Sequence, residues 1–419
     1  MAKKSGEFSF DDLNKVMSKN SKWGGLMSDG AGVSEITEYI PTGNYILNAA
    51  FTGSLFQGIP NNRSVQIYGP SSTGKTYILL NLAREAQKKG YYVIWYDSEN
   101  AIESGQVKSF GCDITKFRYE PVQTVQEFRT SVTNLVDTLI EQKEMGNTIP
   151  KIFIVLDSAG NLATQKEIDD SKAGQEKQDM TRAKVMKSIF RILMSKLGVI
   201  GASFVFSNHC YNTLDLFSQQ VAAGGTAGEY GASIILLVNK AKLKNGNEQV
   251  GIIVNAKPTK NRFCKPVCVK FHIDYKTGLN PFVGLDEYIS WDRCGIGRGK
   301  FISEKDWSKL SESEQEKTYK VETSEEVKYF YPSDTGRNIC CDNGDMYPLG
   351  KLFTSQVFTK DRLKRLDEYI QSEFKYPEGV QVNDLFGENV EDEFCVTENS
   401  ESEIVDQSSD DMIKNQLFD

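Results

Sequence analysis

Residues 69 to 76 form a glycine-rich segment directly after a short apolar run. The segment consists of Gly69, Pro70, Ser71, Ser72, Thr73, Gly74, Lys75 and Thr76. A helical pattern follows it and ends near Lys89, before Gly90. Strand, glycine-rich turn and helix in this order form a phosphate-binding loop, because backbone N–H groups and the helix N-terminus together attract an anion. The spacing predicts a nucleotide site, with Lys75 at the outer phosphates and Thr76 at Mg²⁺.

Length and composition limit the class of protein. The chain has 419 residues, of which 39% are hydrophobic and 25% charged, enough for two or three domains with a sizeable core. No apolar stretch approaches the roughly 18 residues that span a bilayer, and no apolar segment follows the N-terminal lysines. The eight cysteines include no Cys-x-x-Cys pair, which favours reduced thiols over a zinc site. We therefore expect a cytoplasmic protein without membrane contact.

Charge is unevenly distributed along the chain. Residues 384–419 hold twelve Asp or Glu and one lysine, a net charge of −11, so the remaining residues carry +3 of the total of −8. This segment is rich in Ser, Asn and Glu and poor in large apolar residues, which predicts disorder. Such a tail has one of three roles: it does no more than keep the protein soluble, it competes with a polyanion for a basic surface, or it binds a basic partner.

Strand and helix patterns alternate between about residues 65 and 278. Six apolar runs have the length of strands: Val65–Tyr68, Tyr92–Tyr96, Ile152–Leu156, Ser203–Ser207, Ile234–Val238 and Gly251–Val254. Between them, apolar residues recur at helical spacing from Val125 to Leu139 and from Ala183 to Leu197. The alternation predicts an α/β fold, a mostly parallel sheet flanked by helices, with ligands at the carboxyl ends of the strands.

Further segments are expected on both sides of this core. Residues 9–18 predict a short helix, because Ser9 and Asp12 have the spacing of a capping box and Phe10 and Met17 share an apolar face. An isolated helix this short is marginal in water, so it must dock on the body or on a neighbouring subunit. The predicted organisation is an N-terminal helix and linker at 1–35, a core at 36–280, a small mixed C-terminal domain at 281–383 and the acidic tail at 384–419.

Polar residues follow three of the apolar runs, where a ligand of the sheet would bind. Asp157 follows four apolar residues, the pattern of a carboxylate that orders Mg²⁺ behind a phosphate loop. Glu99 is the best candidate to orient or deprotonate a water that attacks the γ-phosphate; the alternative is a solvated carboxylate. His209 can touch both the γ-phosphate and the next loop, and so sense hydrolysis; the alternative is a structural histidine.

Two long polar segments leave the ends of adjacent strands. They are Thr164–Asp179 and Cys210–Gly228, and the second contains Phe217 and the pair Gly224 and Gly225. Loops of this length in a compact domain are usually functional or disordered. An aromatic side chain and adjacent glycines suit a loop that lies against nucleotides.

The helix between these loops carries a basic stripe. Lys184, Lys187 and Arg191 recur at three- and four-residue spacing, away from the apolar residues of the same helix. A charged stripe is normally a solvated face. Beside two polar loops, it equally suits the phosphates of a single strand, and we predict that it binds DNA together with Arg182.

Several motifs together resemble the RecA family of recombinases, and more specifically the UvsX recombinases of T4-like phages. The matching segments are Ile40-Pro41-Thr42-Gly43, Ile67–Thr76, Tyr96-Asp97-Ser98-Glu99, Asp157–Ala163, Asp179–Lys184 and Asn208-His209. The resemblance covers about residues 36–285, and it is specific because many motifs recur in the same order. It implies a RecA-like P-loop ATPase core that uses ATP and Mg²⁺, in the cytoplasm of an infected bacterial cell if the source is a phage.

The resemblance further implies partners and an activity. Proteins of this family form filaments on single-stranded DNA and pair it with homologous duplex DNA, in recombination, repair and recombination-dependent replication. Single-stranded DNA, duplex DNA and further copies of the chain are therefore the implied partners. The resemblance also implies two accessory partners, a recombination mediator and a single-strand-binding protein.

The resemblance also gives roles to individual residues. Glu99 matches the catalytic glutamate and Asp157 the Mg²⁺-ordering aspartate, while His209 stands where bacterial RecA has a glutamine sensor. Thr164–Asp179 and Cys210–Gly224 match the first and second DNA-binding loops, with Phe217 near the aromatic residue of the second.

The residues of this chain that would lie near the adenine and at the subunit interface agree less closely with those of the family. Glu103 matches an acidic residue near the adenine, but Gln106 stands where the family has a stacking tyrosine, which puts base selectivity in doubt. Lys257 and Lys260 lie in the segment that supplies cations to the ATP of a neighbouring subunit.

Two other functions share most of these features. A ring-shaped helicase or other motor has the same core, but it usually couples that core to a separate recruiting domain and linker, which this sequence does not reveal. An ATP-gated scaffold or mediator would bind DNA and hydrolyse little, against which Glu99 argues. D-loop formation would separate a recombinase from both.

Overall fold

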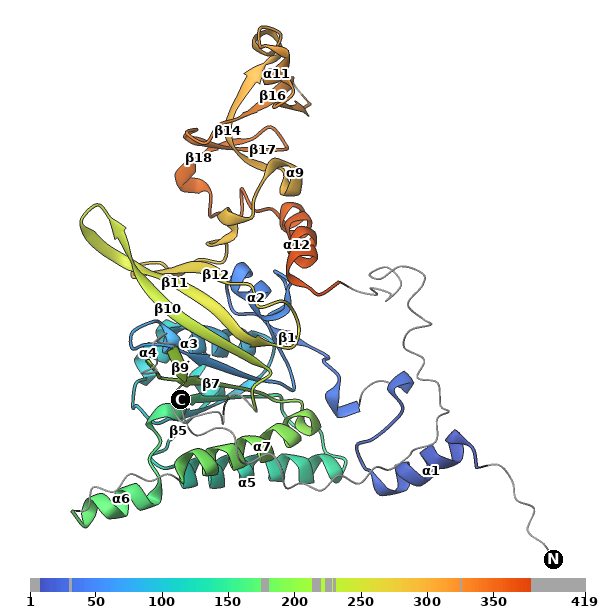
Figure 1. Ribbon diagram of the computed structural model, residues 1–419, viewed down its shortest axis with the longest axis vertical. Coiled ribbons are helices and arrows are strands. Elements are labelled where there is room, and N and C mark those ends of the chain that lie inside the picture. The colour runs from blue at the N-terminus through green and yellow to red at the C-terminus, as the bar shows by residue number, and fades with distance from the viewer. Residues whose placement is uncertain are drawn as a thin grey trace, which may run out of the picture. The chain divides into compact units, whose positions relative to one another are not determined.

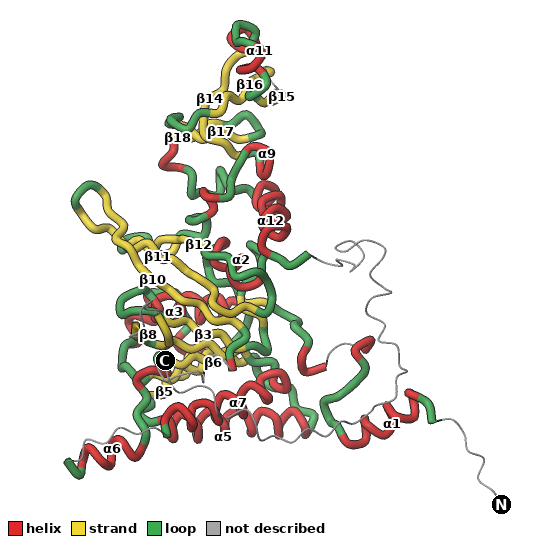
Figure 2. Tube along the Cα trace, viewed as in Figure 1, coloured by secondary structure: helices red, strands yellow, loops and turns green. Residues whose placement is uncertain are grey.

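The computed structural model describes residues 8–29, 32–174, 181–212, 220–222, 228, 231–324 and 326–377. Up to Tyr376 they belong to one compact unit, whose elements are drawn in Figures 1 and 2. The acidic tail at 384–419 lies outside the described residues, so its predicted disorder stays a prediction. None of the helices in the described ranges is long and apolar enough to cross a membrane.

A nine-stranded sheet lies at the centre of the protein (Figure 2). Its strands are β3 (Ser64–Tyr68), β4 (Tyr92–Asp97), β5 (Phe117–Pro121), β6 (Ile152–Asp157), β7 (Ser203–Asn208), β10 (Ile234–Asn245), β11 (Glu248–Asn261), β12 (Val269–Asp274) and β13 (Gly278–Leu279). The order across the sheet is β13-β12-β11-β10-β3-β7-β6-β4-β5. All pairs from β10 to β5 are parallel, whereas β10 to β13 pair antiparallel. The predicted α/β fold with a mostly parallel sheet is confirmed.

Helices cover both faces of the sheet because the strand side chains alternate between two cores. In β6, Phe153 and Val155 belong to one apolar cluster, and Ile154 and Leu156 belong to the other. The first cluster includes residues of α2 (Tyr45–Thr52) and α3 (Lys75–Lys88). The second includes residues of α5 (Val125–Glu144) and α7 (Arg182–Ile200), which lie side by side in Figure 1.

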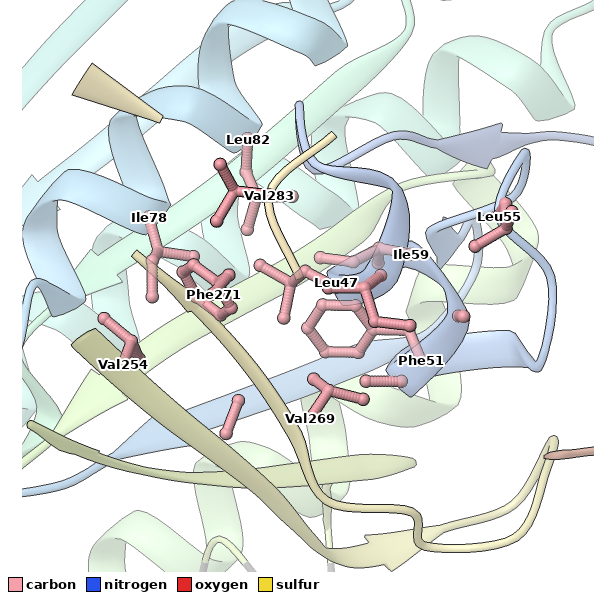
Figure 3. Packing of buried hydrophobic residues seen from close by; sticks show 14 of the residues in the cluster. Leu47, Phe51, Leu55, Ile59, Ile78, Leu82, Val254, Val269, Phe271 and Val283 are labelled. Carbon is pink, nitrogen blue, oxygen red and sulfur yellow. The ribbon is translucent and has the colours of Figure 1, made fainter. Parts of the chain in front are cut away.

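The first cluster fixes the position of α3, the helix that follows the phosphate loop. Leu47 and Phe51 of α2 and Ile78 of α3 lie among Val269 and Phe271 of β12 (Figure 3), and each is at most 1% exposed. Burying a side chain of this kind contributes roughly 1.5–3 kcal/mol. The packing therefore holds the N-terminal end of α3 at a defined place beside the sheet.

The long helices have the predicted ranges, with one local difference. α7 buries Met186, Phe190, Leu193 and Leu197 as predicted. Ala183, which we expected on the same face, is exposed. It lies in the first turn of α7, before Met186, the first residue of this helix that packs in the second apolar cluster.

The N-terminal helix has the predicted start. α1 (Phe10–Asn20) begins after Ser9, whose side chain and that of Asp12 form both bonds of the capping box. No residue of α1 is buried, and Phe10 and Met17 are 67% and 58% exposed. The apolar face of this helix therefore has no covering surface within the described part of the chain.

The C-terminal residues form a second, antiparallel sheet. Its strands are β14 (Ile296–Ser303), β15 (Tyr319–Glu322), β16 (Val327–Pro332), β17 (Asn338–Cys341) and β18 (Met346–Pro348), in the order β15-β16-β14-β17-β18. The shorter elements of the chain are β1 (Tyr39–Ile40), β2 (Ile59–Pro60), α4 (Ser104–Ser109), α6 (Gln165–Lys172), β8 (Cys210–Asn212), β9 (Gln220–Ala222), α9 (Trp291–Cys294), α10 (Glu304–Trp307) and α11 (Glu312–Gln315).

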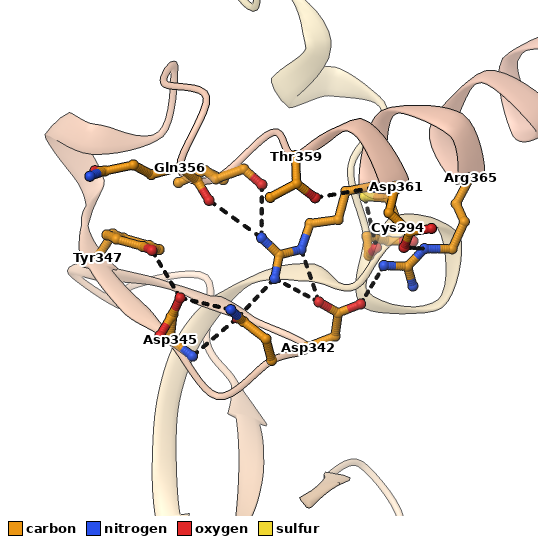
Figure 4. A network of polar contacts seen from close by, with 12 residues as sticks. Cys294, Asp342, Asp345, Tyr347, Gln356, Thr359, Asp361 and Arg365 are labelled. Carbon is orange, nitrogen blue, oxygen red and sulfur yellow. Dashed lines mark hydrogen bonds and ion pairs between the residues drawn. The ribbon is translucent and has the colours of Figure 1, made fainter. Parts of the chain in front are cut away.

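A carboxylate ties the second sheet to the last helix, α12 (Lys360–Phe374). Asp342 accepts bonds from Arg362, at 2.9 and 2.7 Å, and from Arg365 (Figure 4). Burial acts to raise the pKa of Asp342, but the two guanidinium groups outweigh it and hold that pKa below its usual value. Asp342 therefore stays ionised and keeps both arginines in place.

The same helix joins the central core. Asp367 of α12 is buried and accepts bonds from the Leu55 backbone N–H at 2.5 Å and from the Ser54 hydroxyl at 3.1 Å. Leu366 and Ile370 belong to the same apolar cluster as α2 and α3. The C-terminal segment thus shares its core with the large sheet, while a domain boundary near residue 281 stays a prediction.

Candidate active site

The phosphate loop joins β3 to α3, as the sequence predicts. Gly74 is the N-cap of α3 and has a φ of +87°, a left-handed conformation that glycine adopts without strain. Gly69 lies against β10, where a Cβ would come within 2.1 Å of the Val238 carbonyl oxygen. The two glycines therefore permit a tight turn against the neighbouring strand, and they place the loop at the N-terminus of a 14-residue helix, which attracts anions.

Lys75 is buried inside this loop. Its Nζ donates hydrogen bonds of 2.9 Å to the carbonyl oxygens of Gly69 and Pro70. Burial lowers the pKa of Lys75, and the carboxylates of Glu99 and Asp157 oppose that shift. Phosphate oxygens are stronger acceptors than neutral carbonyls, so a bound triphosphate would compete for these donors.

Asp157 ends β6 and faces the start of α3. Its Oδ2 accepts a 2.7 Å bond from the Thr76 hydroxyl, and its Oδ1 accepts a bond from the Ser207 hydroxyl on β7. Burial raises the pKa of Asp157, although its bonds to Ser207 and Thr76 act in the opposite direction. A cation at this carboxylate would favour its ionised form. Ser207, the last residue of a predicted apolar run, thus joins the site, although the sequence analysis assigned it no role.

The oxygens of Thr76 and Asp157 fit a Mg²⁺ site. Mg²⁺ takes hard oxygen ligands and is commonly bound through one or two carboxylates together with substrate phosphates and water. Within the described ranges, no group of three or more His, Cys, Asp or Glu side chains converges as a metal cage. The donors present therefore suit a metal that is shared with a phosphate ligand.

Glu99 and His209 meet at the same edge of the sheet. The Nε2 atom of His209 lies 3.0 Å from Oε1 of Glu99, within hydrogen-bonding distance. Glu99 follows β4, and His209 lies between β7 and β8, at the start of the second polar loop. The structure thus brings the two residues that the sequence singled out after different strands into direct contact.

Asp97 holds the segment that carries Glu99, a role that the sequence analysis missed. Its Oδ1 accepts a 2.8 Å bond from the Glu99 backbone N–H, and its Oδ2 accepts bonds from the Ala101 N–H at 3.0 Å and the Tyr119 hydroxyl at 3.3 Å. Asp97 is 1% exposed. An Asp that bonds the backbone two residues later is a recognised turn pattern, and that spacing was the available signal.

A cavity of about 610 Å³ opens beside the phosphate loop. It is lined by loop residues Ser72 and Gly74 and by aromatic side chains. The aromatic residues are Tyr77, Phe110 and Tyr275. Charged side chains line it as well, namely Arg84, Asp274 and Lys276, so the cavity combines aromatic and polar surface beside the phosphate loop.

Glu103 and Gln106, predicted near the base, belong to a neighbouring part of the surface. Glu103 precedes α4 and lines a different cavity of about 410 Å³, with Phe117 and Tyr119. Gln106 lies within α4, and Phe110 at the end of that helix reaches the cavity beside the phosphate loop. Phe110, rather than Gln106, is therefore the residue of this segment that lines the cavity beside the phosphate loop.

The predicted DNA-binding residues of α7 differ in their surroundings. Lys184 and Lys187 are exposed, as a phosphate-binding stripe requires. Arg182 is partly buried, and its guanidinium donates to the carbonyl oxygens of Ala159, at 3.0 Å, and of Gly160.

The remaining predicted residues lie on β11 or outside the described ranges. Lys257 and Lys260 are on β11, two strands from β3 in the sheet. Phe217, Gly224 and Gly225 lie outside the described residues, so their DNA-binding roles stay predictions.

The phosphate loop after β3, with carboxylates at the ends of β4 and β6, defines a P-loop protein with a RecA-like core. The family model for the RecA N-terminal domain matches residues 9–280, about two thirds of the chain. The chain belongs to the RecA family, and this membership makes it an ATP-dependent recombinase.

Individual relatives agree with this assignment. The chain is 28% identical over 352 residues to the "Recombination and repair protein" of Enterobacteria phage T4, covering 81% of this chain and 85% of that protein. It is 28% identical over 265 residues to Protein RecA of Bifidobacterium longum, covering 61% and 62% of the two chains. With Protein RecA of Streptomyces coelicolor it shares 29% identity over 270 residues, or 62% and 67% of the chains.

Proposed function

We propose that this protein polymerises on single-stranded DNA with ATP and Mg²⁺ bound, pairs that strand with homologous duplex DNA, and releases it on hydrolysis. This activity would serve recombination, repair and recombination-dependent replication. The 3.0 Å contact between His209 and Glu99 carries the proposal, because it joins the candidate hydrolytic carboxylate to the start of the second polar loop. ATP would order both loops, and its hydrolysis would release them.

The site residues divide the chemistry among them. Lys75 and the N-terminal N–H groups of α3 would bind the phosphates, and Thr76 and Asp157 would hold Mg²⁺, which neutralises charge on the transferred phosphoryl group. Glu99 would orient the attacking water and accept its proton, since its carboxylate stands at the edge of the same site. Asp97 would fix Glu99 for this task through the backbone bond.

Polymerisation is supported by the N-terminal helix. The face of α1 that contains Phe10, Leu13 and Met17 is exposed over 42% or more of each side chain. Removing such a face from water is favourable, and a neighbouring copy of the chain is the surface that a filament would supply. Lys257 and Lys260 on β11 are proposed as cations for the ATP of that neighbour.

The rival functions differ in what the protein does to duplex DNA. A recombinase forms a D-loop from a single strand and a homologous supercoiled duplex, whereas a helicase unwinds a forked duplex without needing homology. A scaffold carries out neither reaction, and it hydrolyses little ATP. Formation of D-loops only with homologous DNA, and filaments in electron micrographs with single-stranded DNA and a non-hydrolysed ATP analogue, would support the proposal. Homology-independent unwinding without D-loops would contradict it.

The role of His209 is tested by His209→Ala. The variant should still bind ATP, but ATP should no longer raise its affinity for single-stranded DNA, because the contact between Glu99 and the second loop is lost. Fluorescence anisotropy with labelled DNA, with and without the ATP analogue, measures this enhancement. His272→Ala is a matched control, since His272 is the other histidine of the chain and packs against Phe353. An unchanged enhancement in His209→Ala would reject the sensor role.

Deletion of residues 384–419 should strengthen DNA binding. The segment carries −11 and can occupy the basic surface that phosphates need, so we expect duplex affinity to rise by about tenfold at low salt. The gain should shrink as salt rises, because exposed charges are screened beyond about 8 Å at physiological ionic strength. Salt titrations of both proteins, without any partner, measure the effect. Overlapping curves would instead indicate that the tail binds a basic accessory protein, such as a mediator or a single-strand-binding protein.

A further inference from the structure

Arg182 is the first residue of α7, three positions after Asp179, the last residue of the segment predicted to be the first DNA-binding loop. Its Nη2 donates to two consecutive carbonyl oxygens, those of Ala159 and Gly160. Lys184, two residues further along the same helix, is exposed instead. The guanidinium of Arg182 is therefore directed toward the protein rather than toward a polyanion.

The two carbonyls that accept bonds from Arg182 belong to a turn that follows the candidate Mg²⁺ ligand, Asp157, and lies against the candidate sensor, His209. Ala159–Asn161 form a short 3₁₀ turn that begins two residues after Asp157. A Cβ on Gly160 would come within 2.8 Å of Oδ1 of Asn208 and 3.1 Å of Cδ2 of His209. A side chain at this position would press on Asn208 and His209, so the turn lies directly against the end of β7.

The contacts form a continuous path. It runs from Arg182, at the start of α7, to the carbonyl of Gly160, across that residue to His209, and from His209 to Glu99 at 3.0 Å. The Nε of Arg182 is buried without a hydrogen-bond partner among the described residues. An unsatisfied buried donor is unfavourable, so the two bonds of Nη2 to the turn are what hold this guanidinium in place.

We propose that Arg182 is a positioning residue that couples the first DNA-binding loop to the catalytic Glu99 through the turn at Gly160 and His209. DNA that orders the first loop would fix the start of α7, and Arg182 would pass that constraint to the turn. The ATP site would then sense DNA by two routes, one through each loop. This inference rests on the proposed function, because it assumes that DNA stimulates ATP hydrolysis.

The test compares Arg182→Ala with Lys184→Ala, which removes a cation two residues away on the same helix. For each protein, one measures the ratio of ATP turnover at saturating single-stranded DNA to turnover without DNA, and the salt dependence of DNA binding. Arg182→Ala should lower the ratio by about tenfold and leave the salt slope as in the wild type. Lys184→Ala should keep the ratio and reduce the slope by about 0.7, the value for one lost phosphate contact on a single strand.

Gly160→Ala tests the same path without changing charge. Its added methyl would press on Asn208 and His209, so the DNA stimulation should fall while the salt slope stays unchanged. Thermal unfolding followed by circular dichroism checks that both variants remain folded, and either folded variant suffices for the test.

The outcomes separate the coupling role from its alternatives. Wild-type stimulation in folded Arg182→Ala or Gly160→Ala would overturn the proposal. A loss of about 0.7 in the salt slope of Arg182→Ala would make Arg182 an ordinary phosphate contact and would also overturn it. If DNA does not stimulate ATP turnover in the wild type, the proposed function fails and the coupling fails with it. If DNA stimulates the wild type and the folded variants equally, only the coupling fails.

Discussion

Lys75→Ala is expected to weaken ATP binding by about a hundredfold and to abolish strand exchange. The Nζ of Lys75 is buried and donates two bonds of 2.9 Å within the phosphate loop. Charge-assisted hydrogen bonds contribute roughly 1.5–3 kcal/mol each, so losing two that this ammonium group would donate to phosphate oxygens costs about 3 kcal/mol or more, which is roughly a hundredfold in Kd. Titration with a fluorescent ATP analogue gives the affinity, and D-loop formation gives the exchange activity.

A lysine at the other end of the same helix provides the control. Lys88 is exposed and pairs with Glu85 at 2.7 Å. An exposed ion pair of this kind contributes about 1 kcal/mol at most, so Lys88→Ala should bind ATP and form D-loops like the wild type. Strand exchange at the wild-type rate in Lys75→Ala would contradict the assignment of the phosphate loop.

The sequence was most informative where local chemistry and burial agree. The phosphate loop needs glycine at positions 69 and 74 for the backbone reasons that the structure shows, so eight residues sufficed to place β3 and α3. The buried strands of the parallel sheet are continuous apolar runs because both of their faces are covered. By contrast, β5 lies at the edge of the sheet and is largely exposed. Its sequence therefore contains no apolar run, and the sequence analysis missed this strand.

Contacts made across the fold were beyond the reach of sequence patterns. Glu99 and His209 were each predicted from a strand end, but their mutual contact depends on the order of the strands in the sheet. Arg182 shared its helix with the basic stripe, and only the structure shows its bonds to backbone carbonyls. The C-terminal sheet was predicted only as a mixed domain, because its strands of three to eight residues lack a long periodic signal.

Glu99→Gln is expected to slow ATP turnover by about 10²–10⁴-fold while ATP and DNA binding remain intact. Glutamine has nearly the same shape as glutamate, and its amide oxygen can still accept a bond from His209. It cannot accept a proton from the attacking water, and the loss of a general base has an effect of roughly this size. Steady-state ATPase assays measure turnover, and binding of the labelled nucleotide and of labelled DNA measures the retained interactions.

Two comparisons decide whether the effect of Glu99→Gln is chemical. Glu141→Gln is the matched control, because it makes the same substitution at an exposed carboxylate of α5, outside the candidate site, and should leave turnover unchanged. Filaments of Glu99→Gln on single-stranded DNA should persist with ATP as they do in the wild type with a non-hydrolysed analogue, since release follows hydrolysis. If Glu99→Gln loses ATP binding, the carboxylate holds the loop in place together with Asp97 rather than acting on water. If it turns over ATP at the wild-type rate, another group is the base, and the contact with His209 has only a signalling role.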